Sequence, residues 1–297
     1  MRYSISLCYD GSSFYGWQLQ PGVPTVQGTL EDALGKLLRS SISVTGAGRT
    51  DTGVNAIGYV AHFDAPEGLD TEALGYKLNA ILPPSIVVLK VSGTSEDFHS
   101  RFDATKREYT YFLHRRKDPF VAQYSWQCLY QLDIQAMSKA AEMLLGKHDF
   151  RCFQKTGTDV KTSICTVTEA GWHSYTPEHC SITHFPCEEG DYLYFRISAD
   201  RFLRNMVRAI VGSLIDVGRG KMSLEAFASL ILPCISEPPC HSEPSCHSER
   251  SEESGSFGKP QDDNRRPSRS DAGESVPGHA LFLSSVSYPT DCLVEHI

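Results

Sequence analysis

The order of strand-like and helix-like segments in the first hundred residues restricts the fold more than any other feature of this sequence. Short segments alternate apolar and polar side chains, as half-buried strands do. Helical spacing of apolar residues follows Thr25 and again follows Asp70, and both residues are good N-caps. Strands are predicted at residues 2–9, 57–63, 86–91 and 98–102. This order predicts a split β-α-β unit over an antiparallel sheet.

A comparable order recurs after Ala104. Strands are predicted at residues 107–114, 164–172, 192–199 and 280–288, and helices at 134–145 and 203–214. The repetition predicts an α+β protein made of two similar split β-α-β halves, similar to ferredoxin-like or RRM-like folds. We expect the first half to cover residues 1–104 and the second to cover residues 105–297.

A segment of unusual composition interrupts the second half. Six-residue units rich in Ser, Glu and Pro begin at Cys234, Cys240 and Cys246, and a Ser/Pro/Asp/Arg tract follows. Such composition offers almost nothing to bury, so it predicts a disordered insertion at about 233–270. The Cys-His pairs of the repeat are compatible with a soft metal, but this composition predicts no packed frame around them. The other seven cysteines are scattered singly without a C-x-x-C pair, so no structural metal is expected.

Charge is distributed unevenly along the 297 residues. The formal net charge is −8, and residues 233–279 contribute half of it. Residues 99–117 and 196–221 each hold six Lys or Arg and two acids. Such patches favour a polyanionic partner or are ordinary solvated faces, and the sequence leaves both interpretations open. Three of these arginines, Arg201, Arg204 and Arg208, are spaced to form a basic stripe on the predicted helix.

The sequence also bears on the compartment. No apolar run approaches the length of a membrane span, and residues 1–7 lack the apolar block of a signal peptide. We therefore expect a cytoplasmic protein with no membrane partner.

The segment Gly46–Ala56 carries the most chemical information. It places Asp51 among glycines and two residues after Arg49, where a substrate can approach the backbone closely. Asp51-Thr52-Gly53 is also the triplet of aspartic proteases, but those enzymes need a second carboxylate and no second triplet occurs here. A phosphate-binding loop would need a following Lys-Ser/Thr, which is absent. A simple turn-capping role for Asp51 stays open at this point.

Taken with several other segments, this motif resembles the catalytic motif of the tRNA pseudouridine synthase A family. The matching segments follow the order of that family and cover nearly the whole chain outside about 233–270. They are Tyr9–Gln18, Gly48–Ala56, Asn79–Pro83, Phe98–Ala104, Arg107–Tyr111, Gly146–Phe150, Phe202–Arg208 and Ala272–Pro277.

The resemblance implies a fold and an activity. The family isomerises uridine to pseudouridine at positions 38–40 of the tRNA anticodon arm, without a cofactor or metal. Its members are homodimers in which two α/β halves share a mixed, mainly antiparallel sheet with flanking helices and a central basic cleft. The resemblance assigns the nucleophile to Asp51, base stacking to Tyr109, pairing with the aspartate to Arg208 and RNA contact to Arg49.

The residue types suit this chemistry. A base inside a stem must be flipped out before an enzyme can reach it, and a tyrosine face can stabilise the flipped base by about 1–3 kcal/mol. An arginine adjacent to Asp51 favours its charged form. Two departures are visible: Asn55 stands where the family commonly has His, and Cys165 where many members have Arg. A non-catalytic tRNA-binding or chaperone protein with the same surface is the alternative.

Overall fold

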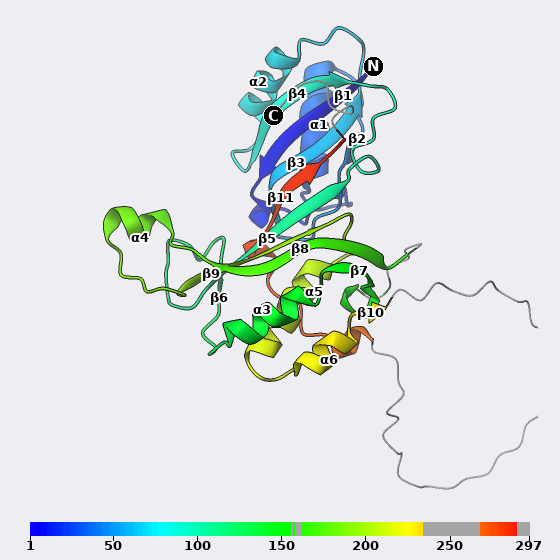
Figure 1. Ribbon diagram of the computed structural model, residues 1–297. Helices are drawn as coiled ribbons and strands as arrows, with labels where there is room; N and C mark the ends of the chain where they lie inside the picture. Colours follow the sequence, from blue (N-terminus) through cyan, green and yellow to red (C-terminus); the bar gives the residue numbers. More distant parts are fainter. Residues whose placement is uncertain (156, 158–161, 234–267, 290–297) are drawn as a thin grey trace, which may run out of the picture.

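The computed structural model describes residues 1–155, 157, 162–233 and 268–289 (Figure 1). One eleven-stranded sheet runs through both halves of the molecule, in the order β10-β7-β8-β9-β5-β11-β3-β1-β4. Two short strands lie off this path, with β2 paired to β3 and β6 paired to β5. The predicted insertion at about 233–270 lies outside the described residues except at its two ends.

The first half forms the predicted split β-α-β unit. Its strands lie in the order β4-β1-β3-β2, and every neighbouring pair is antiparallel. Helices α1 and α2 contact each other, and α2 packs against β4. The elements are β1 (Arg2–Tyr9), η1 (Gly11–Ser13), α1 (Val26–Leu38), β2 (Val44–Gly46), β3 (Asn55–Asp64), α2 (Thr71–Ile81) and β4 (Ile86–Thr94).

The second half repeats this arrangement with strands in the order β11-β5-β9-β8, again antiparallel throughout. Helix α3 packs against β8 and α5. The repeated elements are β5 (Lys106–His114), α3 (Ile134–Glu142), β8 (Ile164–Ser174), β9 (Tyr192–Ala199), α5 (Met206–Gly218) and β11 (Leu281–Ser287). The additional elements are β6 (Trp126–Gln127), β7 (Gly146–Asp149), η2 (Arg151–Phe153), α4 (Glu178–Thr183), α6 (Leu224–Ser229), β10 (Leu232–Pro233), η3 (Arg269–Asp271) and η4 (Gly278–Ala280).

Strand β11 joins the two halves. It pairs antiparallel with β5 of its own half and parallel with the start of β3, where Phe282 lies opposite Asn55 and Leu283 opposite Ala56. The sheet is therefore mixed but mainly antiparallel, and the predicted α+β fold class is confirmed. Figure 1 shows β11 between β3 and β5, at the centre of the molecule.

The helices begin where the sequence provides caps. Thr25, Asp70 and Asp133 each accept a hydrogen bond from a backbone N–H in the first turn of the helix that follows, at 3.2, 2.9 and 2.9 Å. These bonds satisfy donors that the helix itself leaves without a partner. Each half also has a separate hydrophobic core. Tyr109 packs against both cores, so it lies at the junction of the two halves.

Three details of the secondary structure differ from prediction. Residues 98–102 form turns rather than a strand. The helix expected at 203–214 is α5, which begins only at Met206 because Asn205 has a left-handed backbone, with φ of 65°. Arg201 and Arg204 therefore precede the helix, and the predicted helical stripe of three arginines is wrong. Within the described ranges, no helix is both long and apolar enough to cross a membrane.

Candidate active site

Asp51 lies on the loop between β2 and β3, and neighbouring segments hold this loop firmly. The buried hydroxyls of Thr50 and Tyr9 hydrogen-bond to each other at 2.9 Å. The Trp17 backbone N–H donates to the Thr50 carbonyl at 3.2 Å, and the Val54 N–H donates to the Asp51 carbonyl at 3.1 Å. Thr50 therefore faces the protein interior, and the Asp51 side chain remains about a quarter exposed.

Two glycines allow the segment after β1 to approach this loop closely. A Cβ on Gly16 would lie 2.4 Å from the Thr50 carbonyl oxygen, and a Cβ on Gly11 would lie 2.1 Å from that of Val54. Both distances are too short for any side chain. Gly16 also has a φ of 89°, which residues with side chains rarely adopt. The segment Tyr9–Gln18, noted for its resemblance to the family, thus supports the backbone on both sides of Asp51.

Asn55 fastens the other end of the loop. Its buried carboxamide accepts a hydrogen bond from the Gly11 N–H at 2.8 Å and donates one to the His279 carbonyl at 2.7 Å. It thereby links the segment after β1 to η4, just before the strand that joins the halves. A carboxamide can donate and accept at once, whatever the pH. Asn55, which stands where the family commonly has His, therefore has a clear structural role.

Two arginines from the second half face the Asp51 carboxylate. Arg208 Nη1 lies 3.6 Å from Asp51 Oδ2, and Arg204 Nε lies 3.9 Å from Asp51 Oδ1. Arg208 is held in place, because its Nε donates to the Val276 carbonyl at 2.7 Å. Only Arg208 and Asp216 of α5 are not buried, so Arg208 emerges from a helix that is otherwise almost completely buried.

Arg204 was placed by the sequence only in a basic stripe and was given no role beside Asp51. It reaches Asp51 because the left-handed Asn205 turns the chain between the two arginines, and the Asn205 side chain donates to Ser275 Oγ at 2.6 Å. A helical projection could not show this. The available signal was the position of Arg204 in the segment Phe202–Arg208, which matches the family.

Tyr109 comes from β5 and lies near Asp51. Its ring packs edge-on against Phe202, with centroids 5.1 Å apart and an interplanar angle of 87°. Burial, followed by the negative charge of Asp51, raises the pKa of Tyr109 to about 12. Its hydroxyl therefore stays protonated at neutral pH.

Arg49 does not join this group. Its side chain is exposed, and its Nε donates to Gln18 Oε1 at 3.0 Å. The cations that the structure places beside Asp51 are Arg204 and Arg208, so the expectation that the neighbouring Arg49 accompanies the carboxylate is wrong. The structure thus brings together Asp51, Tyr109 and Arg208 of the four predicted residues, and adds Arg204.

The two basic patches are partly occupied by internal contacts. Arg107 donates to the carbonyls of Ala104 and Asp200, each at 2.8 Å, and its burial lowers its pKa. Arg116 lies 3.3 Å from Asp191, and Arg196 Nε lies 3.7 Å from Glu108. The count of basic residues therefore overstates the charge that these patches present to a partner.

Cys165, the second departure from the family pattern, lies inside the protein. The side chain is fully buried on β8, and burial raises its pKa to about 12. It therefore does not contribute to an exposed contact surface.

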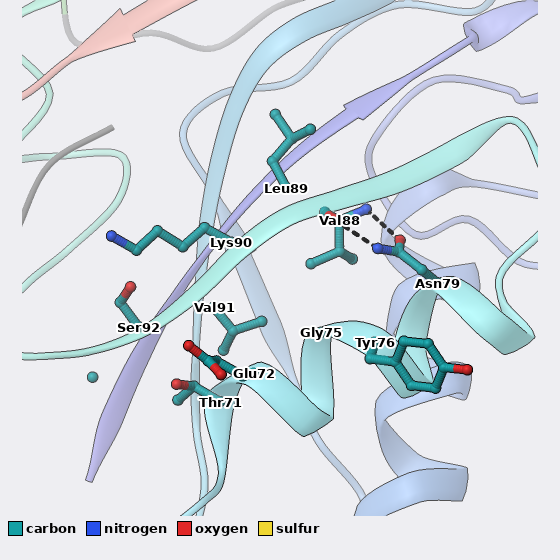
Figure 2. A pocket seen from close by; sticks show the side chains of 11 residues that line it. Thr71, Glu72, Gly75, Tyr76, Asn79, Val88, Leu89, Lys90, Val91 and Ser92 are labelled. Atoms are coloured by element: carbon teal, nitrogen blue, oxygen red, sulfur yellow. Dashed lines mark hydrogen bonds between the residues drawn. The ribbon is translucent and has the colours of Figure 1, made fainter.

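A shallow pocket between α2 and β4 contains none of the residues around Asp51 (Figure 2). Asn79 links the two walls, donating to the Val88 carbonyl at 2.8 Å and accepting from the Val88 N–H at 2.7 Å. The Asn79 side chain, part of another family-like segment, therefore fixes α2 to the edge strand.

Around Asp51, the arrangement combines one accessible carboxylate, two guanidinium groups and an aromatic face. A shared-proton aspartic dyad would require a second carboxylate where the guanidinium groups lie. The arrangement instead suits a single anionic nucleophile beside a flat, negatively charged substrate.

Comparison with known proteins agrees with this chemistry. The family model described as tRNA pseudouridine synthase matches residues 6–103 and 140–238. A tRNA pseudouridine synthase A from Bacteroides thetaiotaomicron is 42% identical over 294 residues, covering 99% of this chain and 93% of the relative. One from Bacillus subtilis is 36% identical over 292 residues, covering 97% and 99%. The chain belongs to the tRNA pseudouridine synthase family.

Proposed function

We propose that this protein isomerises uridine to pseudouridine in tRNA, at positions 38–40 of the anticodon arm. The observation that carries this proposal is the placement of the Asp51 carboxylate within 4 Å of two arginines and beside Tyr109, in a member of this family. The target lies in a base-paired or stacked arm, so the base must first be flipped out of the stack.

Asp51 is the proposed nucleophile. In the reaction, the bond from N1 of the base to C1′ of the ribose breaks, the base turns, and a bond from C5 to C1′ forms. The C5 proton is lost to solvent and N1 gains a proton, so product and substrate are isomers. The net change involves no oxidation and needs no cofactor. An anion beside the sugar and base can assist detachment by attacking C1′ or C6.

The neighbouring residues have complementary roles. Tyr109 supplies a flat face on which the flipped base stacks, and Arg208 with Arg204 orients the Asp51 carboxylate. Arg49, which is exposed near the start of the loop, is the proposed contact to the RNA backbone. We further propose that the protein acts as a cytoplasmic homodimer, and that residues 1–104 and 105–297 are its two structural halves.

The direct test is replacement of Asp51 by Asn, which keeps size and hydrogen bonding but removes the charge. We expect release of tritium from C5-labelled uridine in tRNA to fall by at least about a thousand-fold. Binding of tRNA should stay within several-fold of wild type. Asp32→Asn, at an exposed position of α1, is the matched control and should leave activity unchanged.

Mapping the modified uridines by mass spectrometry then locates the product in anticodon-arm fragments. If wild-type protein binds tRNA but releases no label from any tRNA, the protein is a tRNA-binding or chaperone protein instead. If Asp51→Asn retains activity, Asp51 is not the nucleophile.

A further inference from the structure

The connection between β8 and β9 has almost no hydrophobic core of its own. It spans residues 175–191 and carries the six-residue helix α4, at the left of Figure 1. Within it, only Pro177 and Cys180 are buried, and Ile182 is 73% exposed. A single short helix is not stable by itself in water. This one is held by ring contacts of Phe120 with His179 and Phe185, and by Arg116 over the Phe185 ring.

Three potential metal ligands meet where this segment contacts the loop after β5. A carboxylate oxygen of Asp118, a ring nitrogen of His179 and the sulfur of Cys180 all lie within 4.8 Å of one another. His179 Nε2 is 2.8 Å from Asp118 Oδ2 and 3.5 Å from Cys180 Sγ. The Asp118 side chain is completely buried, and 61 residues separate it from His179.

A fourth potential ligand lies beside the three. The Cys187 side chain interacts with Cys180 and is partly exposed, but its sulfur is not among the donor atoms that lie within 4.8 Å of one another. A carboxylate, an imidazole and one thiol are thus gathered, and a second thiol must move toward them to complete four ligands. Cys and His are soft and borderline donors, which favour zinc over magnesium or calcium.

The separation of the Cys180 and His179 donor atoms agrees with tetrahedral coordination. From usual zinc bond lengths, a sulfur and a nitrogen on one ion lie about 3.6 Å apart, and a nitrogen and an oxygen lie about 3.4 Å apart. The Cys180–His179 separation of 3.5 Å matches the first value. The hydrogen bond between His179 and Asp118 must open by roughly half an ångström to admit the ion.

We propose that Asp118, His179, Cys180 and Cys187 bind one zinc-class divalent cation. The ion replaces the protons of the two thiols, which are released to solvent, and the imidazole binds it through Nε2. Four protein ligands leave no open position, so the role is structural. The ion fastens the connection between β8 and β9 to the loop after β5.

Neighbouring groups already support the carboxylate in this role. The Tyr192 hydroxyl donates to Asp118 Oδ2 at 2.6 Å, and the Phe120 N–H donates to Oδ1 at 2.9 Å. Such outer contacts orient a ligand and increase metal affinity. The site shares no residue with the group around Asp51, so the proposal is independent of the reaction proposed there.

The test is the metal content and metal affinity of the full chain, purified under reducing conditions without chelator. We expect one zinc per chain. Titration of the zinc-free protein with Co²⁺ should give the charge-transfer absorption of two thiolates. Cys187→Ala should halve that absorption, and Cys180→Ala should reduce bound zinc below about one tenth. Tyr192→Phe, which keeps the packing, should weaken binding by about ten- to a hundred-fold.

Two controls separate this site from the other cysteines. Cys8→Ala, in β1, should keep the full zinc content. The double variant Cys240→Ala/Cys246→Ala removes the thiols of the two Cys-His pairs of the repeat, and it should also keep the zinc. The proposal is overturned if zinc is lost from the double variant alone, or if the wild-type protein contains no zinc. It is also overturned if Cys180 and Cys187 are found joined in a disulfide after purification under reducing conditions.

A second measurement does not depend on whether the variants fold. The connection contains Glu178, Glu188 and Glu189 but neither Lys nor Arg, so a glutamate-specific protease can probe it. Adding a chelator to wild-type protein should accelerate cleavage at these residues at least several-fold, and zinc should reverse the effect. Equal cleavage with and without chelator contradicts a structural ion.

Discussion

The two halves share one strand order but contribute differently to the site. In the first half, the connection between β2 and β3 covers residues 47–54, is packed against neighbouring segments and presents the anionic Asp51. The equivalent connection in the second half covers residues 175–191 and is largely exposed. The second half instead supplies Arg204 and Arg208 from the region where α5 begins, and Tyr109 from β5.

This difference shows how a repeated fold can build one site. Each half alone has only part of the chemistry, and β11 fixes the parts relative to each other by pairing with both β3 and β5. The connection that carries Asp51 is short and packed against neighbouring segments, which suits a side chain whose position must be constant. The longer connection is free to carry another function.

Among the residues that the second half contributes, the largest effect should follow from removing the cation that this half holds in place. Arg208→Ala should lower kcat/KM for tRNA by about a hundred- to a thousand-fold, as expected for loss of a positioned charged group. Arg204 is more than half exposed and lies farther from Asp51, so Arg204→Ala should reduce the rate only about ten-fold. Single-turnover kinetics on one tRNA check both values. A larger loss for Arg204→Ala than for Arg208→Ala would contradict this ranking.

Variants of Tyr109 test how much the residue at the junction of the two halves contributes to the reaction. Tyr109→Ala removes the proposed stacking face, which should weaken the reaction by about 1–3 kcal/mol, or roughly ten- to a hundred-fold. Tyr109→Phe keeps the ring against Phe202 and should lose less. The readout is the rate of pseudouridine formation at saturating protein. Equal losses for the two variants would show that the hydroxyl, and not the ring face, matters.

Long alternating segments could be predicted from the sequence, and compact turns could not. The strand at residues 192–199 is confirmed as β9 without change, since an eight-residue alternation has a clear period. Strands of two to four residues, such as β2 and β7, are too short to show one. Asp51 was singled out from its Gly-rich segment, whereas its proposed role and the choice of Tyr109 and Arg208 came from the resemblance. The division at residues 104 and 105 stays a prediction.

The contacts of Arg204, Arg49 and Asp118 could not be predicted, because they depend on local backbone conformation and on segments that are distant in sequence. Arg204 joins the site through a left-handed residue that no periodicity indicates. Arg49 turns toward Gln18, to which its Nε donates, although it is only two residues from Asp51 in sequence. Asp118 meets His179 only because the loop after β5 lies against α4.

A smaller effect concerns pH and the first half. Burial, with a contribution from the charge of Arg2, lowers the pKa of His62 to about 4. The unfolded chain therefore binds more protons than the folded one between about pH 6.5 and pH 4, and the free energy of unfolding falls as pH is lowered through this window. We expect His62 to account for roughly 1–2 kcal/mol of this loss, after allowing for solvent screening.

Urea titrations at pH 7 and pH 4.5 measure this contribution. His62→Gln should reduce the difference in unfolding free energy between the two pH values. The residue of the second half to compare with His62 is His114. Its ring nitrogen also forms a hydrogen bond with a serine, at 2.9 Å, and burial also lowers its pKa. If His62→Gln leaves the pH dependence unchanged, the buried imidazole is not its source.

The smallest effect compares one buried tyrosine from each half. Tyr59 donates its hydroxyl to the Gly48 carbonyl, whereas the Tyr111 hydroxyl has no hydrogen-bond partner among the described residues. Removing a satisfied hydroxyl loses about 1 kcal/mol, while removing an unsatisfied buried one relieves a desolvation penalty. Tyr59→Phe should therefore lower the free energy of unfolding by about 1 kcal/mol, and Tyr111→Phe should leave it unchanged or raise it by up to about 1 kcal/mol. Equilibrium unfolding in urea decides between them, and an equal loss in both variants would mean that Tyr111 has a partner in solution.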